Sequence, residues 1–421
     1  MLKYSKLKER IEKDKRRKSE RRKKQQELYG NIKSVITYKN YIASLAICNK
    51  GVGYKNSVQK YNSHAIMNID DTIKTIESGK IPKIGYIKKV TIRERGKERI
   101  ITPIKINDRI TQRVLCDNSL VPLITPKLIY DNGASLKGKG TNFARERMNL
   151  HIEIAKREYG NKFYALVFDF KSFFDSIPHK CCYDVLNDLI DDKQLVNLII
   201  GIIESYQIQD IMNIEDKKER SQELQKLNNH QRIGICLGSQ ISQLMALVVP
   251  NAFDHYIKDT LQIKHSERYM DDGVILHNNK DYLISVKEKL SAVAEKYGLR
   301  FHDKKTKIVK ISKGFQFMKV HYYVHSNGKT IKKLDRSGIT RMRKKLKKYR
   351  RKVDEGKMTL DDVYASVQSW LEHAMIARSF HTRKTMLKLY DELFGGYKIT
   401  RNYFKKHPNE RRNPRLKRKV V

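Results

Sequence analysis

The sequence predicts an α+β fold, in which an antiparallel sheet is combined with helices and a separate helical region follows. Three patterns carry this prediction. Residues 163–168 are an apolar run with the length of a buried strand, residues 268–277 have the pattern of a hairpin, and residues 335–374 show three- and four-residue apolar spacing. The last pattern is typical of amphipathic helices, so the chain combines both kinds of element.

Charge indicates the class of partner. The 421 residues can bury a large core in two or three subdomains, and 88 lysines and arginines against 46 acidic residues give a net charge of +42. This excess is spread along the chain and predicts a polyanionic partner. Phosphate neutralisation is the main sequence-independent source of nucleic-acid affinity, so nucleic acid is the expected partner.

Other compartments and partners are disfavoured. No segment approaches the ~18 apolar residues of a transmembrane helix, which argues against a membrane. The basic N-terminus lacks the apolar stretch of a secretory signal. The five cysteines show no zinc-site spacing and predict reduced thiols in the cytoplasm.

The first hundred residues are predicted to hold a basic arm, helices and a hairpin. Residues 1–28 are dense in Lys, Arg, Glu and Gln, which fits a solubilising tail and an RNA-binding arm equally well. Apolar spacing predicts helices over 32–48 and 70–78, with a loop over 49–62. Alternating residues over 90–103, with Arg-Gly-Lys in the middle, predict a β-hairpin.

A glycine- and lysine-rich loop over 130–140 precedes the buried strand. Its glycines allow close approach of a backbone, and Lys137 and Lys139 supply positive charge, so contact with a phosphate backbone is expected. No Gly-Lys-Ser/Thr sequence opens the helix expected over 142–159, which excludes a nucleotide P-loop.

Helical patterns dominate the remainder of the chain. The polar stretch 207–231 predicts an exposed helix or loop, and residues 315–324 predict a second hairpin. Gly298 is expected to end one of the helices, and Thr359 to cap another. Helices are predicted over 185–190, 195–203, 241–261, 283–297, 339–353 and 360–374.

Three carboxylates lie where predicted strands end. Asp169 directly follows the apolar run, and Asp271 and Asp272 occupy the expected turn of the hairpin. Adjacent like charges are costly unless solvent or a cation neutralises them, and Mg²⁺ prefers carboxylate oxygens. If the strand and the hairpin are neighbours, the carboxylates can hold two Mg²⁺ (or Mn²⁺) ions ~3.5–4 Å apart for phosphoryl transfer. Either segment alone fits a solvated turn or strand end, whereas their combination favours a metal site.

These segments resemble motifs of the reverse transcriptases, in particular prokaryotic enzymes related to those of group II introns, retrons and diversity-generating retroelements. The segment around Asp169 is similar to polymerase motif A, residues 269–272 are similar to motif C, and the likeness covers about residues 90–380. The resemblance implies a right-hand polymerase with fingers, palm and thumb, and RNA-directed DNA polymerase activity. It implies metal binding by Asp169, Asp271, Asp272 and the backbone carbonyl of Phe170.

The same resemblance implies contacts with substrates. Phe174 falls at the steric-gate position, where a bulky ring clashes with a ribose 2′-OH, although plain core packing is an alternative for it. Leu237 and Gln243 depart from the usual Gln and Pro of motif B, a form typical of diversity-generating enzymes that implies reduced fidelity. The segment Asp108-Arg109-x-x-Gln112 is similar to a fingers motif. Nucleotide contacts are expected from Arg99, Phe174, Leu237, Gly238, Gln240 and Lys305, and nucleic-acid contacts from Tyr269, Met270, Lys137, Lys139, Arg341, Lys344, Lys345 and Lys348.

The expected domain organisation is that of a right-hand polymerase. It comprises a basic N-terminal arm (1–28), fingers with the start of the palm (29–160), a palm (161–333) with the polar insertion (207–231), a helical thumb (334–396) and a basic C-terminal tail (397–421).

The expected partners are an RNA template, a DNA or RNA primer, deoxynucleoside triphosphates, a dedicated non-coding RNA and an accessory protein. An RNA-binding, maturase-like scaffold fits the charge equally well, but the complete set of carboxylates favours an enzyme. No segment resembles an RNase H or His-Asn-His nuclease. The resemblance therefore implies a diversity-generating element or an antiphage defence enzyme, and the choice between them stays open.

Overall fold

The structure is a computed structural model that describes residues 2–82, 90–94 and 97–399. It divides into two compact units, which are described separately. The first unit comprises Met1–Ala144, Phe168–Asp271 and Ser285–Lys304, and the second comprises Arg145–Val167, Asp272–Ile284 and Lys305–Val421. Both contain helices and strands, and the paired strands are antiparallel, which confirms the predicted α+β class.

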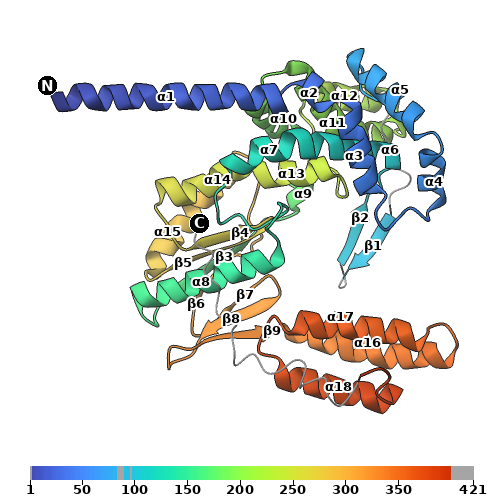
Figure 1. Ribbon diagram of the computed structural model, residues 1–421. Coiled ribbons are helices and arrows are strands. Elements are labelled where there is room, and N and C mark those ends of the chain that lie inside the picture. The colour runs from blue at the N-terminus through green and yellow to red at the C-terminus, as the bar shows by residue number, and fades with distance from the viewer. Residues whose placement is uncertain (1, 83–89, 95–96, 400–421) are drawn as a thin grey trace. The chain divides into compact units, whose positions relative to one another are not determined.

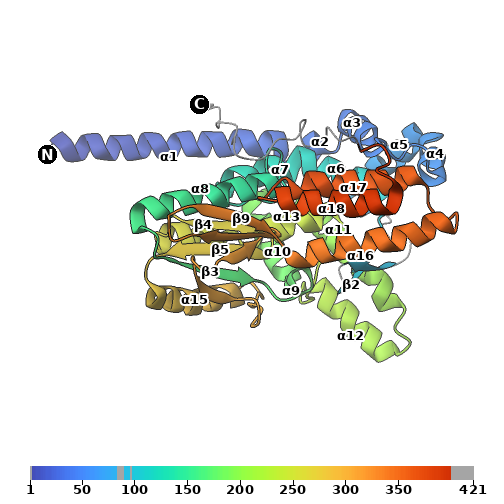
Figure 2. The same cartoon turned by 90° about the horizontal axis from the view of Figure 1, so that it is seen from below.

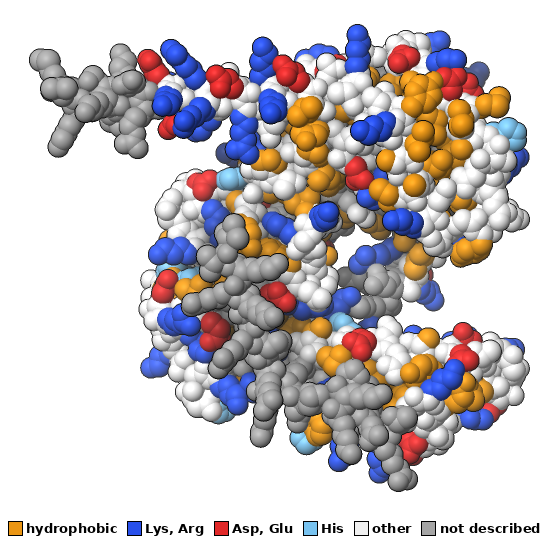
Figure 3. Space-filling model, in the orientation of Figure 1, with side chains coloured by type: hydrophobic (Ala, Val, Ile, Leu, Met, Phe, Trp, Pro, Cys, Tyr) orange, Lys and Arg blue, Asp and Glu red, His pale blue; other side chains and the backbone are white. Residues whose placement is uncertain are grey.

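The first unit begins with a single long helix, α1 (Leu2–Tyr29), which extends away from the helices that follow it (Figure 1). Charged side chains of both signs lie along it from residue 12 onward (Figure 3). Its C-terminal end is attached to the unit, because Arg22 pairs with Asp191 at 2.8 Å and Gln26 donates to the Leu189 carbonyl at 2.8 Å. The basic arm is therefore helical rather than irregular over its described part.

Four short helices follow α1. The single helix expected over 32–48 is interrupted at Thr37, whose hydroxyl caps a new helix by accepting the Asn40 N–H at 3.2 Å. The loop expected over 49–62 is wrong in its second half, where a helix forms and buries Val58 and Tyr61. The helices are α2 (Ile32–Val35), α3 (Tyr38–Cys48), α4 (Asn56–Asn62) and α5 (Ala65–Glu77).

The predicted first hairpin is confirmed. Strands β1 (Val90–Glu94) and β2 (Lys97–Ile101) pair antiparallel, with Val90 opposite Ile101. Residues 95–96 at its tip lie outside the described part of the chain. A helical stretch follows as α6 (Ile106–Leu115), a π-helical turn η1 (Cys116–Leu120), α7 (Val121–Ile124) and a 3₁₀ turn η2 (Thr125–Lys127).

The rest of the first unit is mainly helical. The helix expected over 241–261 is broken at Pro250, because proline lacks the N–H that would continue the helical ladder. The stretch 207–231 was expected to be an exposed insertion. Instead, one helix continues to Met212 and the next helix buries Leu227, so part of the stretch packs against the unit. The elements are α9 (Phe173–Ser176), α10 (His179–Leu189), α11 (Lys193–Met212), α12 (Lys217–Asn228), α13 (Gln240–Val248), α14 (Asn251–His255), a π-helical turn η3 (Tyr256–Thr260) and β4 (Ser266–Tyr269).

The central sheet has four strands in the order β4-β5-β3-β6. The apolar run forms β3 (Tyr164–Asp169) as predicted, and it pairs with β6 (Lys307–Lys310), with Tyr164 opposite Lys310. Strand β5 (Asp272–His277) begins at the second aspartate of the carboxylate pair. Two helices complete this part of the fold, α8 (Thr141–Tyr159) and α15 (Lys280–Glu295), and Gly298 follows the second with a φ of 71°, as expected for a helix end.

The second unit ends in a small sheet and three helices. The expected hairpin over 315–324 is present as β7 (Phe315–Phe317) and β8 (Val320–Val324), and a third strand, β9 (Thr330–Leu334), was not predicted. Helices α16 (Arg336–Asp354), α17 (Leu360–Ala374) and α18 (Phe380–Phe394) lie side by side (Figure 2). They enclose a core of Met342, Leu346, Val363, Val367, Leu371, Met386, Tyr390 and Phe394.

Two further observations complete the description. Within the described residues, no helix combines the length and the apolar character needed to cross a bilayer. Most of the predicted basic C-terminal tail, residues 400–421, lies outside the described part of the chain.

Candidate active site

Two of the three predicted metal-binding carboxylates lie on neighbouring segments of the first unit. Asp169 ends β3, and its side chain is only 6% exposed. The next residue, Phe170, donates its backbone N–H to the carbonyl of Asp271 at 3.1 Å. This bond places the end of the apolar strand beside the turn that carries Asp271, which is the neighbour relation that the sequence predicted.

The opposite edge of this segment is also held by backbone hydrogen bonds. The Asp169 carbonyl accepts the His302 N–H at 2.8 Å, and the Lys171 N–H donates to the Arg300 carbonyl at 2.8 Å. Both edges of the segment are therefore paired, so the position of Asp169 is determined by the sheet rather than by a free loop.

The carboxylate turn differs slightly from the prediction. The turn consists of Met270 and Asp271, whereas Asp272 already begins strand β5. Met270 has a left-handed φ of 54°, which is uncommon for a residue with a side chain. In a regular strand, adjacent side chains point to opposite faces. The backbone conformation of the turn therefore determines the relative directions of the Asp271 and Asp272 side chains.

Arg268, to which the sequence assigned no role, holds this turn. Its guanidinium is 2% exposed and makes two hydrogen bonds to Asp254, at 2.7 and 2.6 Å. It also donates to the carbonyls of Met270 at 2.9 Å and Leu247 at 3.1 Å. A bidentate guanidinium–carboxylate pair fixes geometry as well as charge, so Arg268 locks the backbone of the turn. Two adjacent charged residues, Glu267 and Arg268, inside a buried strand are the sequence signal that could have indicated it.

The donor atoms at this site fit a hard divalent cation. In an extended segment the N–H and C=O of one residue point to the same edge, so the carbonyl of Phe170 faces the same side as its N–H, toward Asp271. The available ligands are carboxylate and carbonyl oxygens from Asp169, Phe170 and Asp271. Oxygen ligands of this kind suit Mg²⁺, which keeps further positions for substrate phosphates.

An aromatic cluster surrounds the neighbours of Asp169. Rings of Phe168, Phe170, Phe253 and Phe301 have centroids 5.4–6.2 Å apart. Phe174 lies outside this cluster and is half-buried, with its ring edge-on to the buried Phe173 at 5.8 Å. Phe174 is thus not an ordinary core ring, and part of it remains accessible.

The loop before α13 is held against α6 and against the residue that follows β2. Gln112 is 1% exposed, and its side-chain oxygen accepts the Ser239 hydroxyl and the Gln240 N–H, both at 3.0 Å. The Thr102 N–H donates to the Leu237 carbonyl at 3.1 Å. Gly238 has a φ of 125°, and a Cβ there would lie 2.8 Å from the Thr102 carbonyl oxygen, so only glycine fits. Three predicted nucleotide contacts, Leu237, Gly238 and Gln240, are therefore fixed together.

The chain also matches a known protein family. The reverse transcriptase (RNA-dependent DNA polymerase) family matches residues 81–322, more than half of the sequence. The chain belongs to the reverse transcriptase family. The match spans the paired segments around Asp169 and Asp271 as well as the loop held by Gln112.

Solved structures similar to this reverse transcriptase include telomerases. Apo telomerase of Candida tropicalis truncated from its C-terminal domain is 16% identical, with a TM-score of 0.38 over 65% of this chain and 60% of that one. Telomerase of Candida albicans in complex with a TWJ fragment of telomeric RNA is 11% identical, with a TM-score of 0.41 over 78% of this chain and 64% of that one. The chain thus spans less than two thirds of either telomerase. No curated protein matches it.

The remaining predicted contacts of the reverse transcriptase are dispersed. Arg99 lies on β2 opposite Ile92 with an exposed side chain, and Lys305 is half-buried before β6 in the second unit. Lys139 donates to the carbonyls of Tyr130 at 2.9 Å and Asn132 at 2.8 Å, so it shapes its own loop. Lys137, Arg341, Lys344, Lys345 and Lys348 are exposed, and Tyr269 and Met270 pack against Ala134, Leu136 and Leu247.

A basic groove in the first unit was missed by the sequence prediction. It has a volume of about 1130 Å³ and extends from α3 and α4 to the loop around Gly238. Among the described residues that line it, none is Asp or Glu. A spacing of five residues between lysines in the stretch expected to be a loop is the signal that could have indicated it. The cations are Lys50, Lys55, Lys60, Lys105, Arg109 and Arg113.

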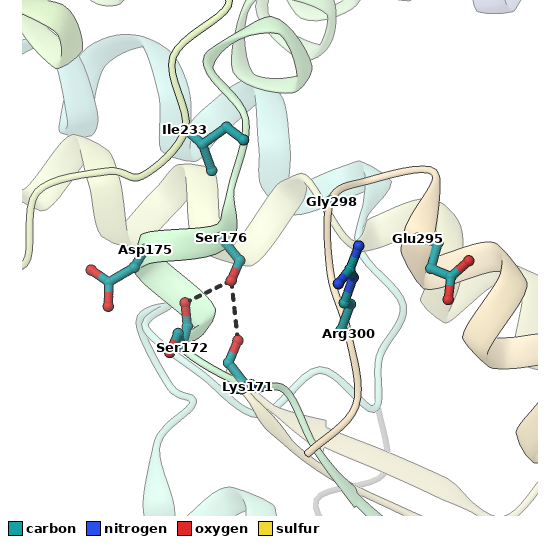
Figure 4. Close-up of a pocket in the computed structure, with 8 residues that line it drawn as sticks. All are labelled: Lys171, Ser172, Asp175, Ser176, Ile233, Glu295, Gly298 and Arg300. Atoms are coloured by element: carbon teal, nitrogen blue, oxygen red, sulfur yellow. Dashed lines mark hydrogen bonds between the residues drawn. The ribbon is translucent and has the colours of Figure 1, made fainter. Parts of the chain in front are cut away.

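A smaller pocket of about 470 Å³ is lined in part by residues 171–176, shortly after Asp169 (Figure 4). Ser176 and Arg300 face each other across it, while the carboxylates of Asp175 and Glu295 turn outward. The Ser176 hydroxyl hydrogen-bonds to the Lys171 carbonyl at 3.1 Å. This pocket has mixed charge and so lacks the uniformly positive lining of the basic groove.

Proposed function

We propose that this chain is an RNA-directed DNA polymerase that copies an RNA template into cDNA by two-metal phosphoryl transfer. The observation that carries the proposal is the hydrogen bond from the Phe170 N–H to the Asp271 carbonyl, which brings two carboxylate-bearing segments together. Family membership supports the same reaction. The neighbouring carboxylates, rather than the charge of the chain, separate this proposal from simple RNA binding.

The chain's own residues contribute mainly positioning. Asp169, Asp271 and Asp272, with the Phe170 carbonyl, would hold two divalent ions, Mg²⁺ being the expected one. When bound, the ions supply charge neutralisation at the reacting phosphate oxygens. The paired edges around Asp169 and the Arg268–Asp254 pair keep these ligands in place without reorganisation, which is how preorganised sites gain rate. The loop held by Gln112 would present Leu237, Gly238 and Gln240 to the incoming nucleotide, and Lys305 would lie near the leaving pyrophosphate.

The basic groove is the proposed path of the template strand next to the copying site. It reaches Gly238 and Gln240, which belong to the loop that would contact the nucleotide. Its lining carries six cations and no carboxylate, and only Arg113 of these cations pairs with a described carboxylate, that of Asp117. This excess of positive charge favours a phosphate backbone over a protein partner. The exposed lysines and arginines of α16 would hold the template–primer duplex in the same way.

The proposed biological setting is a bacterial or phage retroelement that works in the cytoplasm with a dedicated non-coding RNA and an accessory protein. Leu237 and Gln243 in the motif B segment favour a diversity-generating element, and an antiphage defence enzyme is the second candidate. Sequencing of nucleic acid bound to the protein in its cells tests this. Error-rich cDNA from one nearby RNA supports diversification, and faithful or untemplated DNA that rises during infection supports defence.

Primer extension tests the chemistry. The full chain is incubated with an RNA template, a DNA primer, deoxynucleotides and Mg²⁺, and Asp169→Asn and the double change Asp271→Asn, Asp272→Asn are compared with it. Both variants are expected to lose nucleotide incorporation while retaining RNA binding, because they remove metal ligands and leave every Lys and Arg side chain in place. Asp281→Asn, an exposed aspartate of α15, is the control and should remain active. Incorporation by the double variant contradicts the proposal, and RNA binding without incorporation by the unchanged protein favours a maturase-like scaffold.

A further inference from the structure

A buried histidine network adjoins the segment that leads into the nucleotide-binding loop. Residues 232–235 run beside the segment that carries Phe174, all within the first unit. The Gly234 N–H donates to the Ile177 carbonyl at 2.8 Å, and the Ile235 N–H donates to the Phe174 carbonyl at 2.9 Å. The position of Phe174 relative to Leu237 and Gly238 therefore depends on the register of these two segments.

Two side chains hold that register at a single carbonyl. His179 Nε2 lies 2.8 Å from the Gly234 carbonyl oxygen, and Gln207 donates to the same oxygen at 2.6 Å. Because a carbonyl oxygen only accepts, Nε2 of His179 carries the proton. The His179 side chain is fully buried. The backbone N–H of His179 donates to the Arg232 carbonyl at 2.9 Å, so His179 contacts the segment through both its side chain and its backbone.

The contacts around Gly234 leave little room for an alternative arrangement. Gly234 has a φ of 98°, and a Cβ there would lie 3.3 Å from the Asp175 carbonyl oxygen, so the two backbones approach closely. The side-chain oxygen of Gln207 accepts a hydrogen bond from Arg232, which in turn pairs with Glu223 of α12. The polar helix α12 is thereby connected to the same carbonyl.

A carboxylate bonded to a second histidine lies near the other ring nitrogen of His179, without a hydrogen bond to it. Glu204 accepts a hydrogen bond from His230 Nδ1 at 2.6 Å, and its oxygen lies 3.8 Å from Nδ1 of His179. The His230 ring stacks on Tyr183 with centroids 4.4 Å apart. The two histidines and Glu204 form a packed group on one side of the segment, with the Gly234 carbonyl at the far nitrogen of His179.

We infer that His179 is a positioning residue for nucleotide selection, which rests on the proposed polymerase function. By holding the Gly234 carbonyl, it fixes the segment 232–238 against Phe174 and so sets the space between the Phe174 ring and the loop at Gly238. Loss of the buried donor loosens that space. A change in this space should alter nucleotide affinity and the discrimination against ribonucleotides. It should alter the turnover of a bound nucleotide less.

Three variants test the inference. His179→Phe removes the donor and keeps a ring, whereas His179→Gln can return an amide N–H to the position of Nε2. Leu198→Ala is the control, because Leu198 is buried on α11 nine residues before Gln207, which places it on the opposite face of that helix. Should His179→Phe fail to fold, Gln207→Met removes the other donor to Gly234.

Kinetics and hydrogen exchange give separate results. His179→Phe is expected to raise the KM for deoxynucleotides and to lower the deoxy-to-ribonucleotide preference, each about tenfold, with a smaller change in kcat. His179→Gln should restore most of both. Leu198→Ala should lower Tm and leave KM and preference unchanged. Amide exchange over residues 232–238 should accelerate in His179→Phe and not in Leu198→Ala.

The outcomes separate the inference from the function on which it rests. Absence of incorporation by the unchanged protein overturns the polymerase proposal, and the exchange measurement then still decides whether His179 holds the segment. Unchanged KM, preference and exchange in a folded His179→Phe protein overturn the inference. An equal loss of preference in Leu198→Ala also overturns it, since it would reflect general destabilisation.

Discussion

Buried polar residues, rather than the carboxylates alone, set the geometry of the site. Arg268 holds the carbonyl of Met270, and Gln112 holds the loop at Ser239 and Gln240. Removing one partner of a buried ion pair typically costs ~3–5 kcal/mol, because the other charge is left unpaired. A change at Arg268 or Asp254 is therefore more damaging than a change at an exposed lysine.

A single ring is expected to control sugar selection. Phe174 is half-buried, unlike its neighbour Phe173, and follows the Asp169 segment directly. Phe174→Ala should reduce discrimination against ribonucleotides by about 10–100-fold, because space for a 2′-OH is created. Competitive primer extension with paired deoxy- and ribonucleotides measures it. Tyr282→Ala, which removes a half-buried ring from α15, is the matched control, and equal effects of the two would indicate core packing instead.

At the level of single elements, local sequence signals were reliable where caps and turns are explicit. Thr359 accepts the Asp362 N–H at 3.1 Å, and the Asp362 carboxylate accepts the Thr359 N–H at 3.1 Å, which completes a capping box at the start of α17. Thr37 caps α3 in the same way, but this cap was not recognised, since one helix was predicted over 32–48. Where no such signal marks the chain, as at α4, the element was missed.

The cap of α17 gives a stability prediction. Thr359→Ala should lower the free energy of unfolding by about 1 kcal/mol, because the backbone N–H at residue 362 loses its acceptor. Thermal and urea denaturation of the full chain measure the change. Thr385→Ala is the control, since Thr385 is an exposed threonine inside α18 whose hydroxyl bonds only to the His381 carbonyl. Equal shifts for both threonines would contradict a capping role.

At the level of the whole molecule, positive charge contributes to RNA affinity in two ways, a general one from the entire chain and a local one from the basic groove. The net charge of +42 belongs to the entire chain, whereas the basic groove concentrates six cations, of which Arg113 pairs with Asp117, and no Asp or Glu is among the described residues that line it. Counterion release makes the general part strongly dependent on salt. The local part adds position, because the groove reaches the loop at Gly238.

Salt dependence separates these parts. The affinity for single-stranded RNA should fall linearly with salt on logarithmic axes, and changing Lys50, Lys55 and Lys60 to Gln should reduce the slope by about 2, at ~0.7 for each phosphate contact. Changing the exposed Lys287, Lys289 and Lys296 to Gln removes the same charge elsewhere and should leave the slope nearly unchanged. Fluorescence anisotropy at several salt concentrations measures both. Identical slopes for the two triple variants would mean that the groove does not bind the template.

The sequence by itself determined the elements whose signals are local. Buried strands and turns can be predicted from the pattern of adjacent residues. The apolar run before Asp169 and the carboxylate pair at 271–272 were therefore recognised without knowledge of any distant contact. The same holds for both hairpins and for helices α16 and α17, whereas no local pattern was recognised for α18. The α+β class followed from these patterns together.

Tertiary structure decided the features that depend on contacts between distant residues. Gln112 acts on Ser239, Arg268 on Asp254 and Leu247, and His179 on Gly234, and each contact exists only after the segments have packed. Helix α4 and the basic groove have the same origin, because a short helix is stable only when a tertiary contact buries one face, as at Val58 and Tyr61. Local patterns thus identified the reacting groups, and packing decided which side chains hold them in place.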